Sequence, residues 1–171
     1  QLWIREAFGT PLAVGLSDPA EQPKFANAVP RALDPSFKFN TAMGKLKVAV
    51  SQSVQHTGLV APDGITPVPT TIWGYGDEMS GIYPWPGRTF EVQSGAPLEV
   101  KWENRLGRLP LPVTSLGRSV VDTSLHWAYS LLGYEGFTLE KNGFPIGPHV
   151  HGGHTDFQFD GNPVFFFCPG S

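Results

Sequence analysis

Glycine and proline recur along the whole chain and restrict it to short regular segments. The 171 residues include 20 glycines and 17 prolines, without the strict spacing of a collagen-like repeat. Proline fixes φ and lacks an amide donor, and glycine adopts turn conformations readily, so both residues mark turns. Between these turns lie runs of alternating apolar and polar residues. We therefore expect short β-strands separated by turns.

Alternation is clearest in three segments. Residues 44–54 place Leu46, Val48 and Val50 on one face of a predicted strand. Residues 89–92 and 98–104 also alternate, and the turn residues between them predict a β-hairpin. The sequence further predicts strands at residues 70–75, 144–151 and 164–168, a rigid turn at 83–87, and loops at 56–69 and 106–123. Residues 124–132 suit either a short helix or a loop with one turn.

These segments indicate an all-β fold. Five or six short strands with this spacing are typical of a Greek-key β-sandwich or barrel. Residues 1–40 are rich in proline and alanine and show no sustained period, so we interpret them as an extended arm lying on another surface. We place the N-terminal arm at residues 1–44 and a single domain at residues 45–171.

Charge and composition argue against two classes of partner. The net charge of −3 and the pI near 5.9 do not favour nucleic acid. No stretch of about 18 apolar residues is present, so no membrane span is expected. Cys168 is the sole cysteine, which excludes an internal disulfide and a thiolate-rich metal site. We interpret it as a semi-buried apolar residue; pairing with a cysteine elsewhere is the alternative.

The chemistry of the chain concentrates in a histidine-rich stretch. His149, His151 and His154 are three of its five histidines. On the predicted strand, the i, i+2 spacing puts the first two imidazoles on one face, about 6.6 Å apart at the backbone. Imidazole suits copper, zinc and iron. The two rings could share one metal, bind one ion each, or be structural histidines satisfied by hydrogen bonds.

The residues after the pair add to the metal interpretation. Gly152 and Gly153 permit close approach of the backbone, which a crowded metal site requires. Asp160, nine residues beyond His151, is a candidate to orient a ligand or relay protons.

Four segments follow one another in a recognisable order. They are YPWPGRTFEV at residues 83–92, VKWENRL at 100–106, HVHGG at 149–153 and FDGNP at 159–163. Together they resemble the first cupredoxin domain of a multicopper oxidase, most closely the branch with spore-coat laccases, bilirubin oxidase and phenoxazinone synthase. The resemblance spans roughly residues 70–168, and residues 1–69 resemble that branch only loosely.

The resemblance implies a role for each site residue. His149 would bind the "type 2" copper of a trinuclear cluster, and His151 would bind one of the paired "type 3" coppers. Asp160 matches the acidic residue that delivers protons to reduced oxygen. His154 matches no ligand of the family, so we expect it behind the ligands or at the surface. For His126, in a segment that commonly precedes the motif, we expect a structural hydrogen bond near the site.

The resemblance also implies that the remaining copper ligands lie elsewhere. The cluster takes four His-x-His motifs, of which this chain contains the first, and Cys168 does not stand in the His-Cys-His context of a blue copper site. We therefore expect a second polypeptide or a C-terminal remainder as partner, with dioxygen and a small reducing substrate: a phenol, an aminophenol, bilirubin or a metal ion. Enzymes of this kind act in the extracellular or periplasmic space, and a processed Gln1 start is consistent with that location.

Two other interpretations remain. The chain could be a copper-binding cupredoxin module that stores or delivers the metal without catalysis. It could also be a zinc-dependent β-sandwich hydrolase, which would require His154 or Asp156 as a third ligand and an open coordination position.

Overall fold

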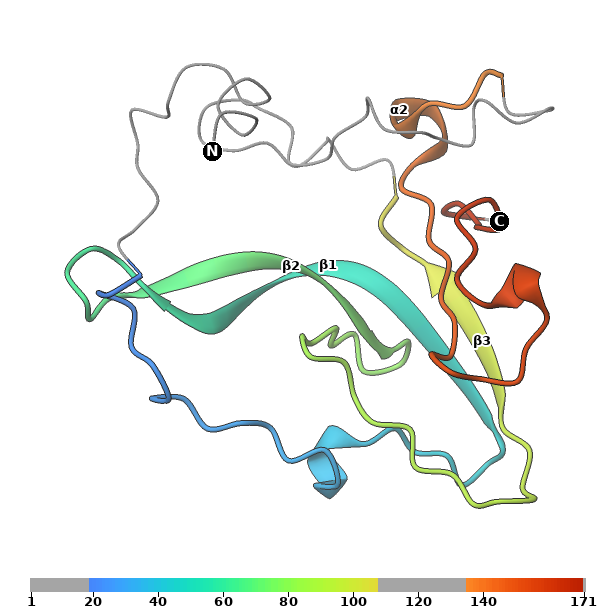
Figure 1. Cartoon of the computed structure of the whole chain (residues 1–171), viewed down its shortest axis with the longest axis horizontal. Coiled ribbons are helices and arrows are strands. Elements are labelled where there is room, and N and C mark those ends of the chain that lie inside the picture. The colour runs from blue at the N-terminus through green and yellow to red at the C-terminus, as the bar shows by residue number, and fades with distance from the viewer. Residues whose placement is uncertain (1–18, 108–134, 171) are drawn as a thin grey trace. The chain divides into compact units, whose positions relative to one another are not determined.

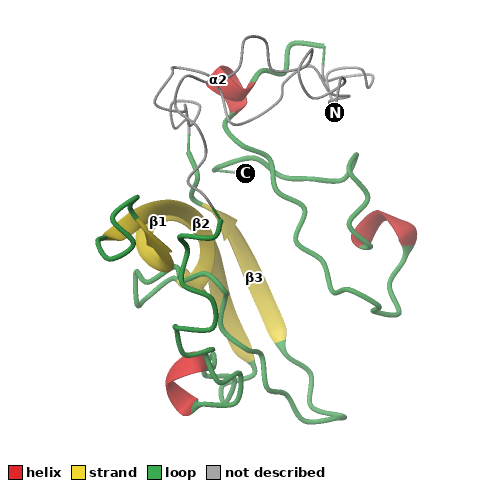
Figure 2. Ribbon diagram, turned by 60° about the vertical axis from the view of Figure 1, so that its left-hand side comes forward, coloured by secondary structure: helices red, strands yellow, loops and turns green. Residues whose placement is uncertain are grey.

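The regular structure of the described part of the chain is mostly β and forms one mixed sheet of three strands (Figure 1). The computed structural model describes residues 19–107 and 135–170. The strands are β1 (Lys45–Val60), β2 (Pro67–Asp77) and β3 (Glu99–Asn104), in the order β2-β1-β3. In the described ranges, helix is limited to α2 (Leu139–Asn142) and the 3-10 turns η1 (Pro35–Phe37) and η3 (Phe157–Phe159). Figure 2 shows that loops make up most of the remainder of the described residues. None of these helices is long enough to cross a membrane.

β1 contains the predicted first strand and continues well beyond it. Leu46, Val48 and Val50 are buried, which confirms the apolar face read from the alternation. The strand extends to Val60 and β2 starts at Pro67, so the loop predicted at residues 56–69 is wrong. The true connection is shorter, and Asp63 stabilises it by accepting hydrogen bonds from the backbone N–H groups of the two residues before Pro67.

β3 pairs with β1 in parallel, from Lys45 opposite Glu99 to Val50 opposite Asn104. The predicted hairpin between residues 89–92 and 98–104 is therefore wrong. A turn does form between these segments, but residues 89–92 contribute only an isolated bridge to Lys38. β3 pairs instead with β1, on the side of β1 opposite β2.

The predicted turn at residues 83–87 is held against the sheet. At Gly76 in β2, a Cβ atom would overlap the carbonyl oxygen of Ile82, so only glycine lets this segment lie so close. The Gln55 side chain of β1 then bonds both backbone polar groups of Trp85, accepting from its N–H at 3.0 Å and donating to its carbonyl. The turn is thus fastened to both strands.

Two buried apolar clusters form the core. The first contains Phe39, Leu46 and Val48, so the end of the predicted N-terminal arm contributes a core residue. The second is built from Val50, Leu106, Phe137, Leu139 and Phe144, with Trp73, Ile146, Phe166 and Cys168 packed against it. Because Val48 and Val50 belong to different clusters, β1 is central to both.

The C-terminal part of the described chain is anchored by Asn104, at the end of β3. Its buried Nδ2 atom donates to the carbonyl oxygens of Phe144 (2.6 Å) and Phe167 (3.3 Å). The strands predicted at residues 144–151 and 164–168 are wrong, since these segments meet only in one antiparallel bridge, Ile146 to Phe167. Pro145 and Pro148 flank that bridge and cannot donate to a ladder.

The chain divides into two compact units. The described part of the first comprises residues 19–29 and 56–70, and that of the second comprises residues 30–55, 71–107 and 135–170. Within these ranges we observe one sheet, without the second layer of the predicted sandwich. The undecided segment 124–132 and most of the loop predicted at 106–123 lie outside the described residues.

Candidate metal centre

His149 and His151 lie side by side in the second unit. Their ring centroids are 4.5 Å apart and their planes differ by 21°, so the two imidazoles are stacked. Both residues are exposed. The predicted juxtaposition of the rings is therefore observed, although the backbone that carries them is not a strand.

A local hydrogen bond orients His149. Its Nδ1 atom lies 3.3 Å from the carbonyl oxygen of Gly147. A carbonyl oxygen only accepts, so this contact is a hydrogen bond in the tautomer with the proton on Nδ1, which leaves the lone pair on Nε2. Metal-binding histidines characteristically donate their other ring N–H to a carbonyl or carboxylate in this way. In this tautomer, Nε2 of His149 is available to coordinate a metal ion.

Gly161 supports the same imidazole from another direction. A Cβ atom at this position would lie 2.6–2.8 Å from three atoms of the His149 ring, and the backbone has a φ of +74°. The positive φ favours glycine, and any side chain at this position would force the His149 ring to move. The ring of His149 therefore rests on the backbone of the turn that follows Asp160.

A tight turn follows His151. The N–H of Gly153 donates to the carbonyl of Val150 at 3.1 Å, and Gly152 has a φ of +71°. Positive φ at the third residue of a four-residue turn is the usual place for glycine. Gly152 thus reverses the chain directly after the second imidazole.

The other predicted site residues are placed less closely. Asp160 is exposed and directly precedes Gly161. It is the C-cap of η3, and its backbone N–H donates to the carbonyl oxygen of Phe157. His154 is exposed in a bend just beyond the turn. His126 lies outside the described residues.

The described donors do not complete a metal site. Within residues 19–107 and 135–170, no group of three or more histidine, cysteine, aspartate or glutamate side chains could hold an ion. The zinc interpretation requires His154 or Asp156 as a third ligand; both residues are described, and neither joins the pair in such a group. Among the described residues the pair therefore offers two neighbouring imidazole donors and no third.

Cys168 has the structural character expected from the sequence. It is half-buried and packs against the second core cluster. Burial raises the pKa of its thiol, which disfavours the thiolate that binds metals.

Sequence reasoning did not identify two groups that position His149. Gly147 supplies the carbonyl that accepts from Nδ1, and Gly161 supplies the backbone on which the ring rests. The only available signal was the position of these glycines, one before the histidines and one beside Asp160. Comparisons with family models, with curated proteins and with solved structures find no match to this chain.

Proposed function

We propose that this chain is the copper-ligand-bearing first domain of a laccase-like multicopper oxidase. The observation that carries the proposal is the stacked pair His149 and His151, in which the Gly147 carbonyl holds the proton on Nδ1 of His149. Copper, when bound, would supply the redox chemistry, coupling one-electron oxidation of a reducing substrate to the four-electron reduction of dioxygen to water. The protein supplies ligand geometry and proton access.

The ring geometry favours one ion for each histidine. A metal lies in the plane of the imidazole that binds it, about 2 Å from the nitrogen. Stacked rings with nearly parallel planes do not converge on one point at that distance, so a shared ion would require one ring to turn. His149 and His151 are therefore assigned to two neighbouring coppers.

Contacts between the segments that carry the family resemblance also support the proposal. In the described residues, Arg105 donates to the Tyr83 hydroxyl at 3.0 Å, which connects the first and second segments. His149 rests on Gly161, which connects the third and fourth. Each contact thus joins two of these segments that follow one another in the sequence, and all four segments belong to the second unit. We propose on the same basis that this unit belongs to a cupredoxin-type Greek-key sandwich.

Asp160 is assigned the proton-relay role. It is exposed, so its carboxylate is accessible to solvent, and its neighbour Gly161 contacts the His149 ring. A carboxylate in this position can pass protons between water and the vicinity of the pair.

The remaining ligands are assigned to a second polypeptide or to further sequence. A cluster with four His-x-His motifs needs more imidazoles than the five histidines of this chain provide. The proposed oxidase is therefore an assembly or a longer protein. Its proposed substrates are phenols, aminophenols, bilirubin or metal ions, and its proposed location is the extracellular or periplasmic space.

A recovery experiment tests the proposal. The tagged full chain is purified with the polypeptides that accompany it, and bound copper and oxygen consumption with a phenol are measured. We expect copper and oxidase activity in this material, and loss of both in a His149→Ala variant. His56→Ala is the matched control, because His56 is an exposed histidine of β1 far from the pair in sequence. Full copper content and full activity in His149→Ala would contradict the proposal.

The limited donor set favours a second candidate, a copper-binding module without catalysis. Two imidazoles bind copper without further groups from the described residues, in which no larger ligand group exists. Copper that is retained by the pair, with no companion polypeptide and no oxygen consumption, is the result expected of such a module.

A further inference from the structure

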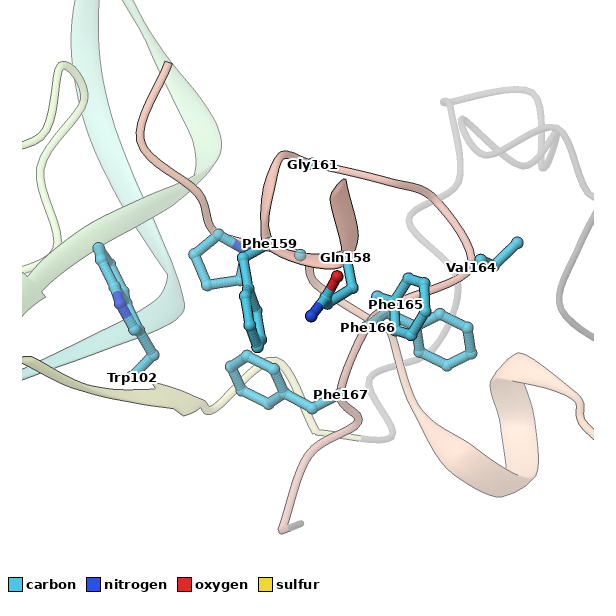
Figure 3. A pocket seen from close by; sticks show the side chains of 10 residues that line it. Trp102, Gln158, Phe159, Gly161, Val164, Phe165, Phe166 and Phe167 are labelled. Carbon is cyan, nitrogen blue, oxygen red and sulfur yellow. The ribbon is translucent and has the colours of Figure 1, made fainter. Parts of the chain in front are cut away.

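A pocket of about 330 Å³ opens beside the candidate metal centre (Figure 3). Its wall is largely aromatic, formed by Trp102 of β3 and by Phe159, Phe165, Phe166 and Phe167, with Val164. Pockets that bind small molecules start at about this volume and have mainly apolar walls. All of the lining residues belong to the second unit.

One polar group stands out in this apolar wall. The Oε1 atom of Gln158 is buried and has no hydrogen-bond partner among the described residues. Figure 3 shows the Gln158 side chain among the aromatic residues that line the pocket. A buried carbonyl oxygen without a donor costs free energy, of the order of 1–3 kcal/mol. An N–H or O–H donor on a bound molecule would satisfy it.

The aromatic residues specify the rest of the ligand. Phe159 and Phe165 remain 64% and 47% exposed, so their rings offer apolar surface at the mouth of the pocket. Phenylalanine and tryptophan rings pack favourably against flat apolar groups through stacked or edge-on contacts. None of the described residues that line the pocket has an ionisable side chain, so these residues offer a charged ligand no partner.

We propose that this pocket binds a small, flat, uncharged aromatic molecule that donates one hydrogen bond to Gln158. This site is separate from the copper ligands and does not depend on copper. Gly147 and Gly161 line the pocket and also contact the His149 ring, so a molecule bound there would lie near that ring.

Binding of two matched probes tests the proposal. Indole and benzofuran have nearly the same shape, but only indole carries an N–H donor. Each is titrated into the copper-free full chain by calorimetry, and the Cε1–H signals of the histidines are followed by NMR. We expect saturable binding of indole about tenfold tighter than that of benzofuran, because one hydrogen bond to a buried acceptor is gained. Ring currents should shift the His149 signal and leave that of His56 unchanged.

Two variants separate the hydrogen bond from the apolar contacts. Gln158→Met keeps the length of the side chain and removes the acceptor. Indole and benzofuran should then bind with about equal affinity. Gln93→Met is the control, because Gln93 is exposed and outside the pocket. Absence of saturable indole binding to the unaltered chain, equal affinity for the two probes, or an unchanged preference in Gln158→Met would each overturn the proposal. None of these results bears on copper binding by the histidine pair.

Discussion

His149 keeps its position because residue 161 has no side chain. The two residues are twelve positions apart, yet the imidazole lies where a Cβ of residue 161 would be. The histidines and Asp160 could be identified from the sequence because their side chains have recognisable chemistry. The role of Gly161 could not, because it consists of space left for another residue and becomes apparent only when the two segments are brought together.

A Gly161→Ala substitution should therefore disturb the metal centre. The methyl group would displace the His149 ring, and a non-glycine residue at a φ of +74° costs about 1–2 kcal/mol in the free energy of unfolding. We expect copper affinity to fall by about tenfold or more, measured by titration of Cu(II) into the copper-free chain, together with a lower midpoint of urea denaturation.

Gly95→Ala is the matched control for this substitution. Gly95 has a φ of +81°, and a Cβ there would meet no atom within 4 Å. The backbone cost should be similar, so the urea midpoint should fall comparably while copper affinity is unchanged. Equal copper affinity in the two variants would show that the contact with His149 has no role in binding.

Asn104 connects β3 to the segment that carries the histidines. Replacing it by alanine would remove the donor from the carbonyl oxygens of Phe144 and Phe167 and the acceptor from the N–H of Leu106. Groups left without partners in a buried position are costly, so we expect Asn104→Ala to lower the free energy of unfolding by about 2–4 kcal/mol. Urea denaturation gives this value.

Asn40→Ala provides the comparison. The Asn40 side chain makes one exposed local bond, accepting from Ala42 N–H at 3.2 Å, and its loss should cost less than about 1 kcal/mol. Similar losses of stability in the two variants would argue against an anchoring role for Asn104.

At the scale of elements, alternation predicted which residues share a face but not which strands pair. The face of Leu46, Val48 and Val50 was predicted correctly, because burial of apolar side chains follows the two-residue period. The hairpin was not, because β3 pairs with a strand more than forty residues earlier. That choice depends on contacts between distant segments, which local patterning does not encode.

The prediction of two C-terminal strands was wrong for a different reason. Apolar runs at residues 144–151 and 164–168 suggested buried strands, but the prolines at 145 and 148 remove donors and Gly152 turns the chain. The apolar character is real, since Phe144 is buried and Phe166 packs on the core. It indicates burial in an irregular segment.

Contact between β2 and the turn at residues 83–87 leads to a test at this scale. In Gly76→Ala the new methyl group would overlap the Ile82 carbonyl, a backbone atom that cannot move independently. We expect a loss of more than about 2 kcal/mol in the free energy of unfolding, as is typical of overpacking against backbone. Thermal or urea denaturation measures it.

Gly87→Ala, in the turn itself, is the corresponding control. Its Cβ would meet Tyr75 at 3.6 Å, an ordinary van der Waals contact, so stability should change by less than about 0.5 kcal/mol. A Gly76→Ala protein as stable as Gly87→Ala would contradict the close packing of this turn on β2.

For the whole molecule, the central question is where copper binds. The second unit places two imidazoles side by side, and the Gly147 carbonyl orients that of His149. The described residues offer no larger group of metal ligands. Under the proposed function, these two imidazoles are part of a copper site, and the other ligands come from a partner or from further sequence. The proposed aromatic pocket, in contrast, is formed within this unit alone.

Electron paramagnetic resonance of the Cu(II)-loaded full chain tests the central claim most directly. Imidazole nitrogens coordinated to copper produce characteristic hyperfine couplings. We predict that His149→Ala and His151→Ala each weaken these couplings, that the double variant abolishes them, and that His56→Ala leaves them intact. Unaltered imidazole couplings in the double variant would show that copper binds elsewhere and would contradict the assignment of this pair as copper ligands.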